Sequence, residues 1–134
     1  MKKRKNVIIP LIVVLGSILL IVGGTRLVKM KKYKKAINTI SIQNVDLSNI
    51  KDGTYTGAFS AVTASAEVSV TVEDNKITKI DILKHEYDWK KAKKAENVIK
   101  QVVKKDTLEV DTISGATASS KIILKAISNA LKVN

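Results

Sequence analysis

The sequence contains no cysteine and only one histidine, and these two absences limit its chemistry. Without cysteine the chain has no disulfides, no thiolate-bound zinc, no iron–sulfur cluster and no thiol nucleophile. A single histidine also excludes metal sites built from two or three imidazoles. Any redox activity of this chain must therefore come from an organic cofactor.

Aromatic residues are also scarce, and the positive charge is unevenly distributed. Three Tyr, one Trp and one Phe are too few for the aromatic, basic surface on which nucleic-acid bases stack. Residues 1–50 hold ten Lys or Arg against one acidic residue, whereas residues 51–134 hold fourteen Lys against eleven acidic residues. The net charge of +12 is mainly an N-terminal property, so we predict no nucleic-acid partner.

A long uncharged run follows the basic N-terminus. No charged residue lies between Asn6 and Thr25, and residues 7–24 are almost entirely aliphatic. A helix of this length approaches the ~30 Å hydrocarbon thickness of a bilayer. We interpret residues 1–6 as a basic tail and residues 7–25 as a transmembrane anchor with Pro10 in its first turn. A cleaved signal peptide is the alternative, but no small-residue cleavage site follows the run.

Basic residues flank this run on both sides, which leaves its orientation open. Four precede it and six follow it closely: Arg26, Lys29, Lys31, Lys32, Lys34 and Lys35. By count alone, the positive-inside rule places the C-terminal domain in the cytoplasm. The second cluster also fits a patch on anionic membrane lipid, which can form on either side of the bilayer. Residues 26–50 are then a basic juxtamembrane linker.

Residues 51–134 have the patterns of a small α+β domain. Val68, Val70 and Val72 alternate with polar residues, and Ile80 and Ile82 alternate after a tight connection at residues 73–76, so we predict an antiparallel hairpin. Ile77 is out of phase, which predicts a bulge. Apolar residues at helical spacing predict two helices, over residues 88–104 with Asp88 as cap and over residues 119–132. We expect a small antiparallel sheet packed with these two helices.

The segment before the last predicted helix has the composition of an anion site. It runs Asp111-Thr-Ile-Ser114-Gly115-Ala116-Thr117-Ala-Ser119-Ser120. Small residues let a phosphate approach the backbone, the hydroxyls can donate hydrogen bonds, and the unpaired N–H groups of a helix N-terminus favour an anion. On these grounds alone, an ordinary helix cap is the more common explanation of such a stretch.

The same residues resemble a known motif. Ser114-Gly-Ala-Thr117, preceded by Asp111 and followed by Ser119 and Ser120, looks like the flavinylation motif of the FMN-binding domain family. That family includes the flavin-carrying subunits of sodium-pumping NADH:quinone reductases and of Rnf complexes. The resemblance extends over residues 46–134 and includes Asp52-Gly-Thr-Tyr-Thr-Gly57 and His85-Glu86. After Glu86 the sequence departs from the respiratory subunits and is more similar to small stand-alone domains of Gram-positive-type bacteria.

This resemblance implies a cofactor and a role for each residue of the motif. A flavin transferase, with FAD as FMN donor, would attach FMN to Thr117 as a phosphoester. Asp111 would serve transferase recognition, and Ser114, Gly115 and Ala116 would contact the phosphate, with the Ser119 and Ser120 hydroxyls as further hydrogen-bonding groups. The flavin would do the redox chemistry while the protein positions it. His85 and Trp89 are candidates to lie near the flavin, but structural roles are the simpler interpretation for them, as packing is for Tyr55.

Three functions remain to be distinguished. The first is an anchored electron-transfer protein on the extracytoplasmic side of the membrane, rather than a self-sufficient enzyme. It would take electrons from a membrane quinol or dehydrogenase and pass them to an extracytoplasmic electron acceptor. The second is a non-covalent FMN-binding or sensory module in which Thr117 only contacts phosphate. The third is a non-redox anchor protein whose motif only caps a helix.

Overall fold

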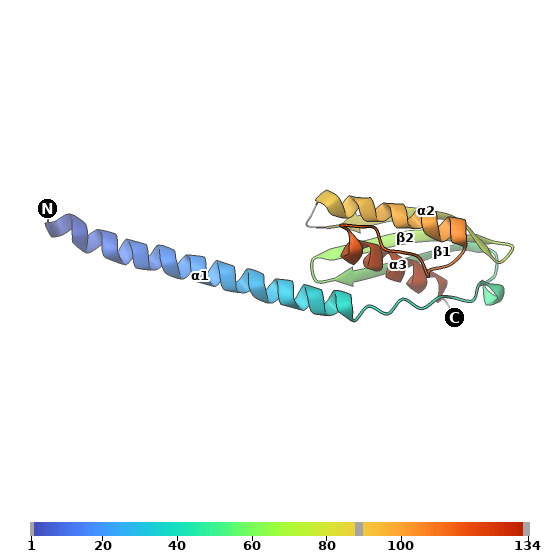
Figure 1. Cartoon of the computed structure of the whole chain (residues 1–134), viewed down its shortest axis with the longest axis horizontal. Helices are drawn as coiled ribbons and strands as arrows, with labels where there is room; N and C mark the ends of the chain where they lie inside the picture. The colour runs from blue at the N-terminus through green and yellow to red at the C-terminus, as the bar shows by residue number, and fades with distance from the viewer. Residues whose placement is uncertain (1, 88–89, 133–134) are drawn as a thin grey trace. The chain divides into compact units, whose positions relative to one another are not determined.

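The computed structural model describes residues 2–87 and 90–132, with only the backbone described for Lys2–Asn6 and Lys91. Within this range the chain forms two compact units, residues 1–34 and 35–134 (Figure 1). The first unit consists of one helix, whose last residues belong to the second unit. The second unit is an α+β domain with a three-stranded antiparallel sheet. The predicted fold class is confirmed.

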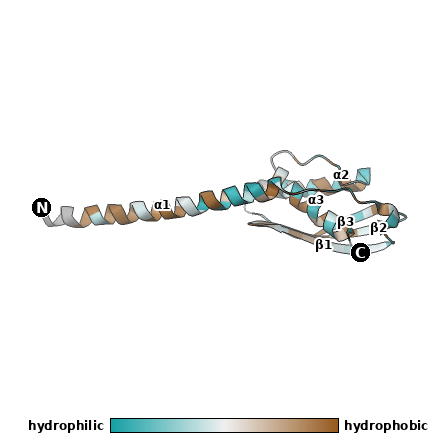
Figure 2. Ribbon diagram, turned by 90° about the horizontal axis from the view of Figure 1, so that it is seen from below, coloured by the Kyte–Doolittle hydropathy of each residue, from teal (hydrophilic) through white to brown (hydrophobic). Residues whose placement is uncertain are grey.

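Helix α1 (Lys2–Asn38) is long and apolar enough to cross a membrane. Its aliphatic side chains between Val7 and Val22 are largely exposed, and hydrophobic colours predominate along this part of the helix (Figure 2). The hydroxyls of Ser17 and of Thr25, just past this stretch, are satisfied internally, because they donate to the carbonyl oxygens of Val14 and Val22. Such bonding lets small polar residues sit in hydrocarbon without an unpaired donor.

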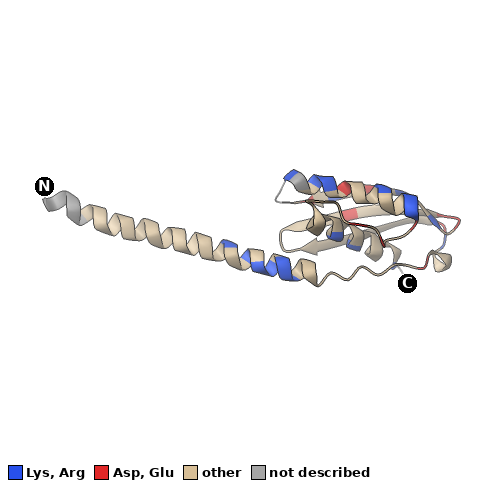
Figure 3. Ribbon diagram, viewed as in Figure 1, with Lys and Arg blue, Asp and Glu red and all other residues tan. Residues whose placement is uncertain are grey.

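Two features of α1 differ from expectation. The prediction that Pro10 lies in the first turn is wrong, because the helix begins at Lys2 and Pro10 lies inside it. Lys and Arg are good helix formers, so the basic tail continues the helix upstream of the apolar run. At its other end α1 extends to Asn38, well past the apolar run and through the second basic cluster (Figure 3).

The sheet of the second unit has the strand order β1 (Gly53–Ala61), β2 (Ala64–Glu73) and β3 (Lys76–Glu86). Val68, Val70 and Val72 are fully buried on one face, as their alternation predicts. Asp74 and Asn75 both have positive φ, which is the geometry of a two-residue hairpin turn. A register shift between Thr71 and Val72 brings Ile77 opposite Val72 and onto the buried face. The predicted bulge is therefore present.

The prediction of one α-helix over residues 88–104 is wrong. Residues 88 and 89, including the proposed Asp88 cap, lie outside the described residues; the chain then forms a 3₁₀-helix, η2 (Lys90–Asn97), followed by α2 (Val98–Lys105). The buried positions explain this change. Ala92, Ala95 and Val98 are three apart, which suits three residues per turn, whereas Val98 and Val102 are four apart, which suits an α-helix.

Helix α3 (Thr117–Leu131) packs against β1 and β2 and supplies much of the core. Ten of its residues are buried. Gly57 of β1 lies so close to α3 that a Cβ there would be 2.3 Å from the Ala126 carbonyl oxygen. Helix and sheet therefore meet through backbone, which fixes the position of α3 and of the loop before it.

The segment before β1 lies against the domain. We call residues 39–46 the strap. The Lys125 ammonium donates to the Ser41 carbonyl oxygen at 3.0 Å, the Lys132 ammonium donates to Gln43 Oε1 at 3.2 Å, and the Leu108 N–H donates to Asn44 Oδ1 at 3.1 Å. Ile37, just before the strap, is buried. A short 3₁₀-helix, η1 (Leu47–Asn49), then leads to β1.

Candidate functional site

The loop of residues 111–116 leads into α3 through a tight turn. Gly115 has φ +78°, a left-handed conformation that favours glycine. The Ala116 N–H donates to the Ile113 carbonyl oxygen at 2.9 Å and closes the turn. A Cβ on Gly115 would meet nothing within 4 Å, so the space beside the turn is open. The loop thus presents backbone to solvent directly before the helix.

The Ser120 hydroxyl braces this loop from inside. It donates to the Ala116 carbonyl oxygen at 2.9 Å and accepts from the Ile113 N–H at 3.0 Å. The side chain is fully buried, so the two bonds are shielded from water. Ser120 therefore fixes the shape of the loop, and its hydroxyl points into the protein.

Thr117 is the first residue of α3 and its side chain is exposed. Its hydroxyl makes no hydrogen bond to any described residue. The N-cap residue is Ala116, which has no side-chain acceptor to offer. The interpretation of the motif as an ordinary side-chain cap is therefore wrong.

Three backbone N–H groups remain free at this helix end. Within the described chain, the N–H groups of Thr117, Ala118 and Ser119 have no backbone acceptor, and the first α-helical bond runs from the Ser120 N–H to the Ala116 carbonyl oxygen. With the positive end of the helix dipole, these donors favour a bound anion. The arrangement provides one accessible hydroxyl beside an anion-binding backbone.

The predicted site residues divide into two groups by burial. Asp111, Ser114, Gly115 and Thr117 are exposed, and they follow one another around the turn. Ala116, Ser119 and Ser120 are buried. The structure thus brings the first group together on the surface and places the second group beneath it, as support.

The sequence interpretation missed Lys121. This residue lies four positions after Thr117, so both start from the same side of α3, and helix side chains lean toward the N-terminus. It is half-buried and forms no ion pair within the described part of the chain. Its ammonium group is available to balance an anion at the helix end, and the i, i+4 spacing was the signal that could have identified it.

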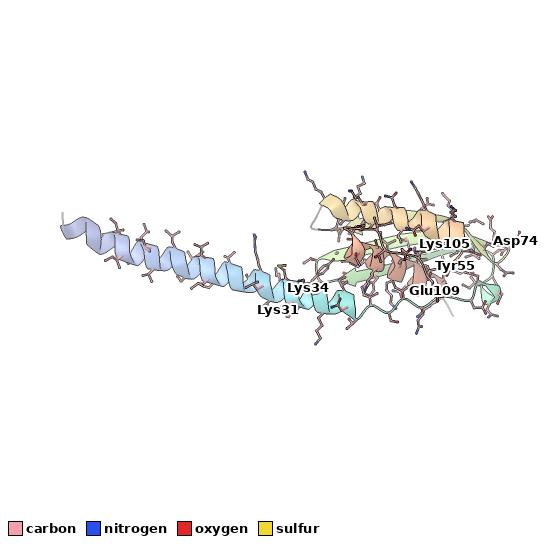
Figure 4. The ribbon with its side chains drawn as sticks, viewed as in Figure 1. Lys31, Lys34, Tyr55, Asp74, Lys105 and Glu109 are labelled. Carbon is pink, nitrogen blue, oxygen red and sulfur yellow. The ribbon has the colours of Figure 1, made fainter. Side chains whose placement is uncertain are left out.

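The other residues singled out in the sequence take separate places. Tyr55 donates to the Lys51 carbonyl oxygen at 2.8 Å and lies toward the end of the domain that holds Asp74 (Figure 4). This end is opposite the start of α3, so Tyr55 is remote from Thr117. Trp89 lies outside the described residues. His85 is nearly buried and bonds Glu96.

Glu86 follows His85 but faces the opposite side of the sheet. It accepts hydrogen bonds from the Lys84 ammonium at 2.9 Å and from Ser65 Oγ at 3.0 Å. The bond from Lys84, that from Ser65 and the Lys84 charge hold the pKa of Glu86 below its usual value. Glu86 thus belongs to an exposed polar network and not to the surroundings of His85.

Comparison with known proteins bears directly on this loop. A sequence model described as the FMN-binding domain matches residues 62–132, from the β1–β2 turn through α3. The match spans more than half of the chain and contains the whole segment from Asp111 to Ser120. No curated protein matches the chain. With its exposed Thr117 at a helix end that favours phosphate, the chain belongs to the FMN-binding domain family, and its cofactor is FMN.

Proposed function

We propose that this protein is a membrane-anchored flavoprotein that carries FMN as a phosphoester on Thr117 and relays electrons on the extracytoplasmic side of the membrane. The observation that carries the proposal is the state of Thr117. Its hydroxyl is exposed and unpaired, at the end of the Ser114-Gly-Ala-Thr motif and within the family match. The family assignment and an N-terminal helix able to span a membrane support the cofactor and the anchor.

The residues of the loop fit an attached phosphate. The free N–H groups at the start of α3 provide hydrogen-bond donors, Gly115 leaves space beside the turn, and Lys121 offers a positive charge. A buried hydroxyl such as Ser120 is already occupied by loop contacts. We therefore assign phosphate binding to backbone N–H groups and Lys121, and loop bracing to Ser120.

Attachment needs an external catalyst. A threonine hydroxyl is a weak nucleophile, and no histidine or carboxylate among the described residues bonds Thr117 Oγ1 to activate it. In the proposed step, a flavin transferase positions FAD and accepts the Thr117 hydroxyl proton, the Thr117 oxygen bonds the FMN phosphorus, the pyrophosphate bond breaks and AMP leaves. Exposed Asp111, at the start of the loop, is the group we expect the transferase to recognise.

Once attached, FMN supplies one- and two-electron redox chemistry. We propose that a membrane quinol or dehydrogenase donates the electrons and that an extracytoplasmic acceptor receives them, as in a stand-alone member of the family. The basic stretch from Arg26 to Lys35 would lie on anionic membrane lipid. A tether through both the anchor and the ester would keep the cofactor at the membrane.

Attachment is tested by producing the full chain with and without a flavin transferase and comparing Thr117→Val. We expect a fluorescent band on a denaturing gel and an intact mass increased by that of one esterified FMN, and both should be absent in the variant. Colour that is lost on denaturation would support the non-covalent alternative. Protein that stays colourless with transferase and flavin present would refute the proposal.

Sidedness is tested with single introduced cysteines, each of which is the only thiol in its variant because the natural sequence has none. In intact cells, an impermeant maleimide should label Thr54→Cys in the domain and not Lys3→Cys in the basic tail. The opposite result would place the domain in the cytoplasm, as the count of basic residues alone suggests.

A further inference from the structure

His85, the only histidine of the chain, is held in a fixed position near the end of β3. Its side chain is only 3% exposed, and Nδ1 lies 3.1 Å from Glu96 Oε1 of η2. The Tyr87 ring lies against the imidazole with a centroid distance of 4.7 Å. Two neighbours therefore fix the plane and the orientation of the ring.

The other ring nitrogen has no partner. Nε2 is buried, and within the described residues nothing hydrogen-bonds it. When Glu96 is a carboxylate and the imidazole is neutral, the bond to Nδ1 requires the ring hydrogen there, which leaves Nε2 as an acceptor. An unpaired buried polar atom costs about 1–3 kcal/mol, and folded proteins retain few of them. A ligand that brings an N–H or O–H donor would complete an acceptor oriented in this way.

His85 lies at the end of the domain that carries Thr117. The C-terminal end of β3, the β1–β2 turn and the start of α3 share that end (Figure 1). His85 pairs with Ala66, which pairs with Phe59, two residues beyond the contact between Gly57 and α3. With about 3.3 Å per strand residue and about 1.5 Å per helix residue, Thr117 is roughly 10 Å further along the same direction. This is the separation along the strand direction alone, and FMN is longer than this from its phosphate to the far edge of its ring.

We propose that His85 Nε2 accepts a hydrogen bond from an N–H or O–H group of the FMN held at Thr117. This inference rests on the proposed function. FMN has suitable donors in the N3–H of the isoalloxazine and in the ribityl hydroxyls. Because Nε2 has no exposed surface, the half-buried Tyr87 ring that lies against the imidazole is the group we expect to move when FMN binds. His85 is a positioning residue for the cofactor, and Glu96 holds its tautomer.

A single histidine makes the experiment direct. The full chain, labelled with ¹⁵N only at histidine, is compared in micelles before and after loading with FMN by a transferase. We expect an upfield shift of the Nε2 resonance on loading, as for a nitrogen that gains a hydrogen-bond donor, with Nδ1 little changed. A yellow chain whose Nε2 resonance does not move overturns this inference and leaves the proposed function intact. A chain that cannot be loaded overturns both.

Two variants separate a cofactor contact from a structural role. His85→Gln retains a polar group near the position of Nε2, whereas His85→Leu retains only bulk. We expect the flavin midpoint potential of the loaded chain to shift in His85→Leu and to stay closer to the native value in His85→Gln. Equal potentials in all three proteins, with altered stability alone, would assign His85 to the fold and overturn the inference.

Discussion

Replacing Gly57 by alanine should displace the helix that carries Thr117. Gly57 is buried in β1, and an added Cβ would lie 2.3 Å from the Ala126 carbonyl oxygen, 2.3 Å from the Ala130 nitrogen and 2.6 Å from the Ala130 Cα. All three are backbone atoms, so no rotation of a side chain relieves the overlap. The only relief is a movement of α3 away from β1.

The distances set the size of the effect. Carbon atoms rarely approach such atoms closer than 3.0 Å, so α3 has to move by roughly 1 Å. Overpacking of a well-packed core costs about 1–3 kcal/mol and sometimes more. Because α3 contributes ten buried residues, we expect the upper end, about 3 kcal/mol. For a domain of this size, that corresponds to a fall in melting temperature of roughly 12–24 °C.

The assay is urea and thermal unfolding of the full chain in micelles, with Gly115→Ala as the matched control. A Cβ on Gly115 meets no atom within 4 Å, so its cost is only that of a left-handed φ, about 1–2 kcal/mol. Removing the Ala130 methyl in a Gly57→Ala, Ala130→Gly double variant should not restore stability. If it does, or if Gly57→Ala is no less stable than Gly115→Ala, the argument from backbone contact is wrong.

Three further changes test single polar groups. Ser120→Ala removes the acceptor of the Ile113 N–H, so we expect a free energy of unfolding lower by about 1–3 kcal/mol and slower FMN attachment. An unchanged free energy of unfolding would contradict the bracing role. Ser128→Ala removes a buried hydroxyl without a described partner, so we expect the free energy of unfolding to rise by about 1 kcal/mol in the same assay. A lower free energy of unfolding would reveal a partner such as bound water. Asn44→Ala leaves the buried Leu108 N–H unpaired, so we expect the free energy of unfolding to fall by about 1–2 kcal/mol and proteolysis of the strap to be faster. Proteolysis at the native rate would show that the strap does not depend on this bond.

The sheet and α3 could be predicted because their burial follows local periods. Val68, Val70 and Val72 alternate along one strand, and the buried residues of α3 recur at helical spacing. The bulge at Ile77 was also visible, since one residue broke the alternation. Each of these signals lies within a few residues of the feature it predicts.

The region before α2 could not be predicted in the same way. Ala92, Ala95 and Val98 define only two intervals of three, which fit both a 3₁₀-helix and an α-helix over so short a length. The strap was even less accessible to sequence reasoning. The hydrogen bond between Ser41 and Lys125 joins residues 84 apart, and nothing in either local sequence indicates the other. The pairing of His85 with Glu96 is another contact set by the tertiary fold.

Within ten residues, the candidate site contains one feature that the sequence predicted and one that it did not. The composition of the loop predicted an anion site at a helix N-terminus, but it also suggested that all the hydroxyls face the anion. Burial of Ser119 and Ser120 corrects that view. Helix phase already contained this information, because Ser120 shares its side of α3 with buried Ile123 and Ile127. Composition identified the segment, whereas periodicity was needed to sort its residues.

The exposure of Thr117 depends on where α3 begins. Leu124 and Ser128 lie seven and eleven residues after Thr117, close to the same side of the helix, and both are fully buried. A threonine on that side would therefore be covered if it lay further along α3. It is exposed because the helix starts there, and it starts there because Gly115 turns the chain and Ser120 ties the loop to the first turn. The motif thus makes the proposed attachment point accessible by setting the position of a helix end.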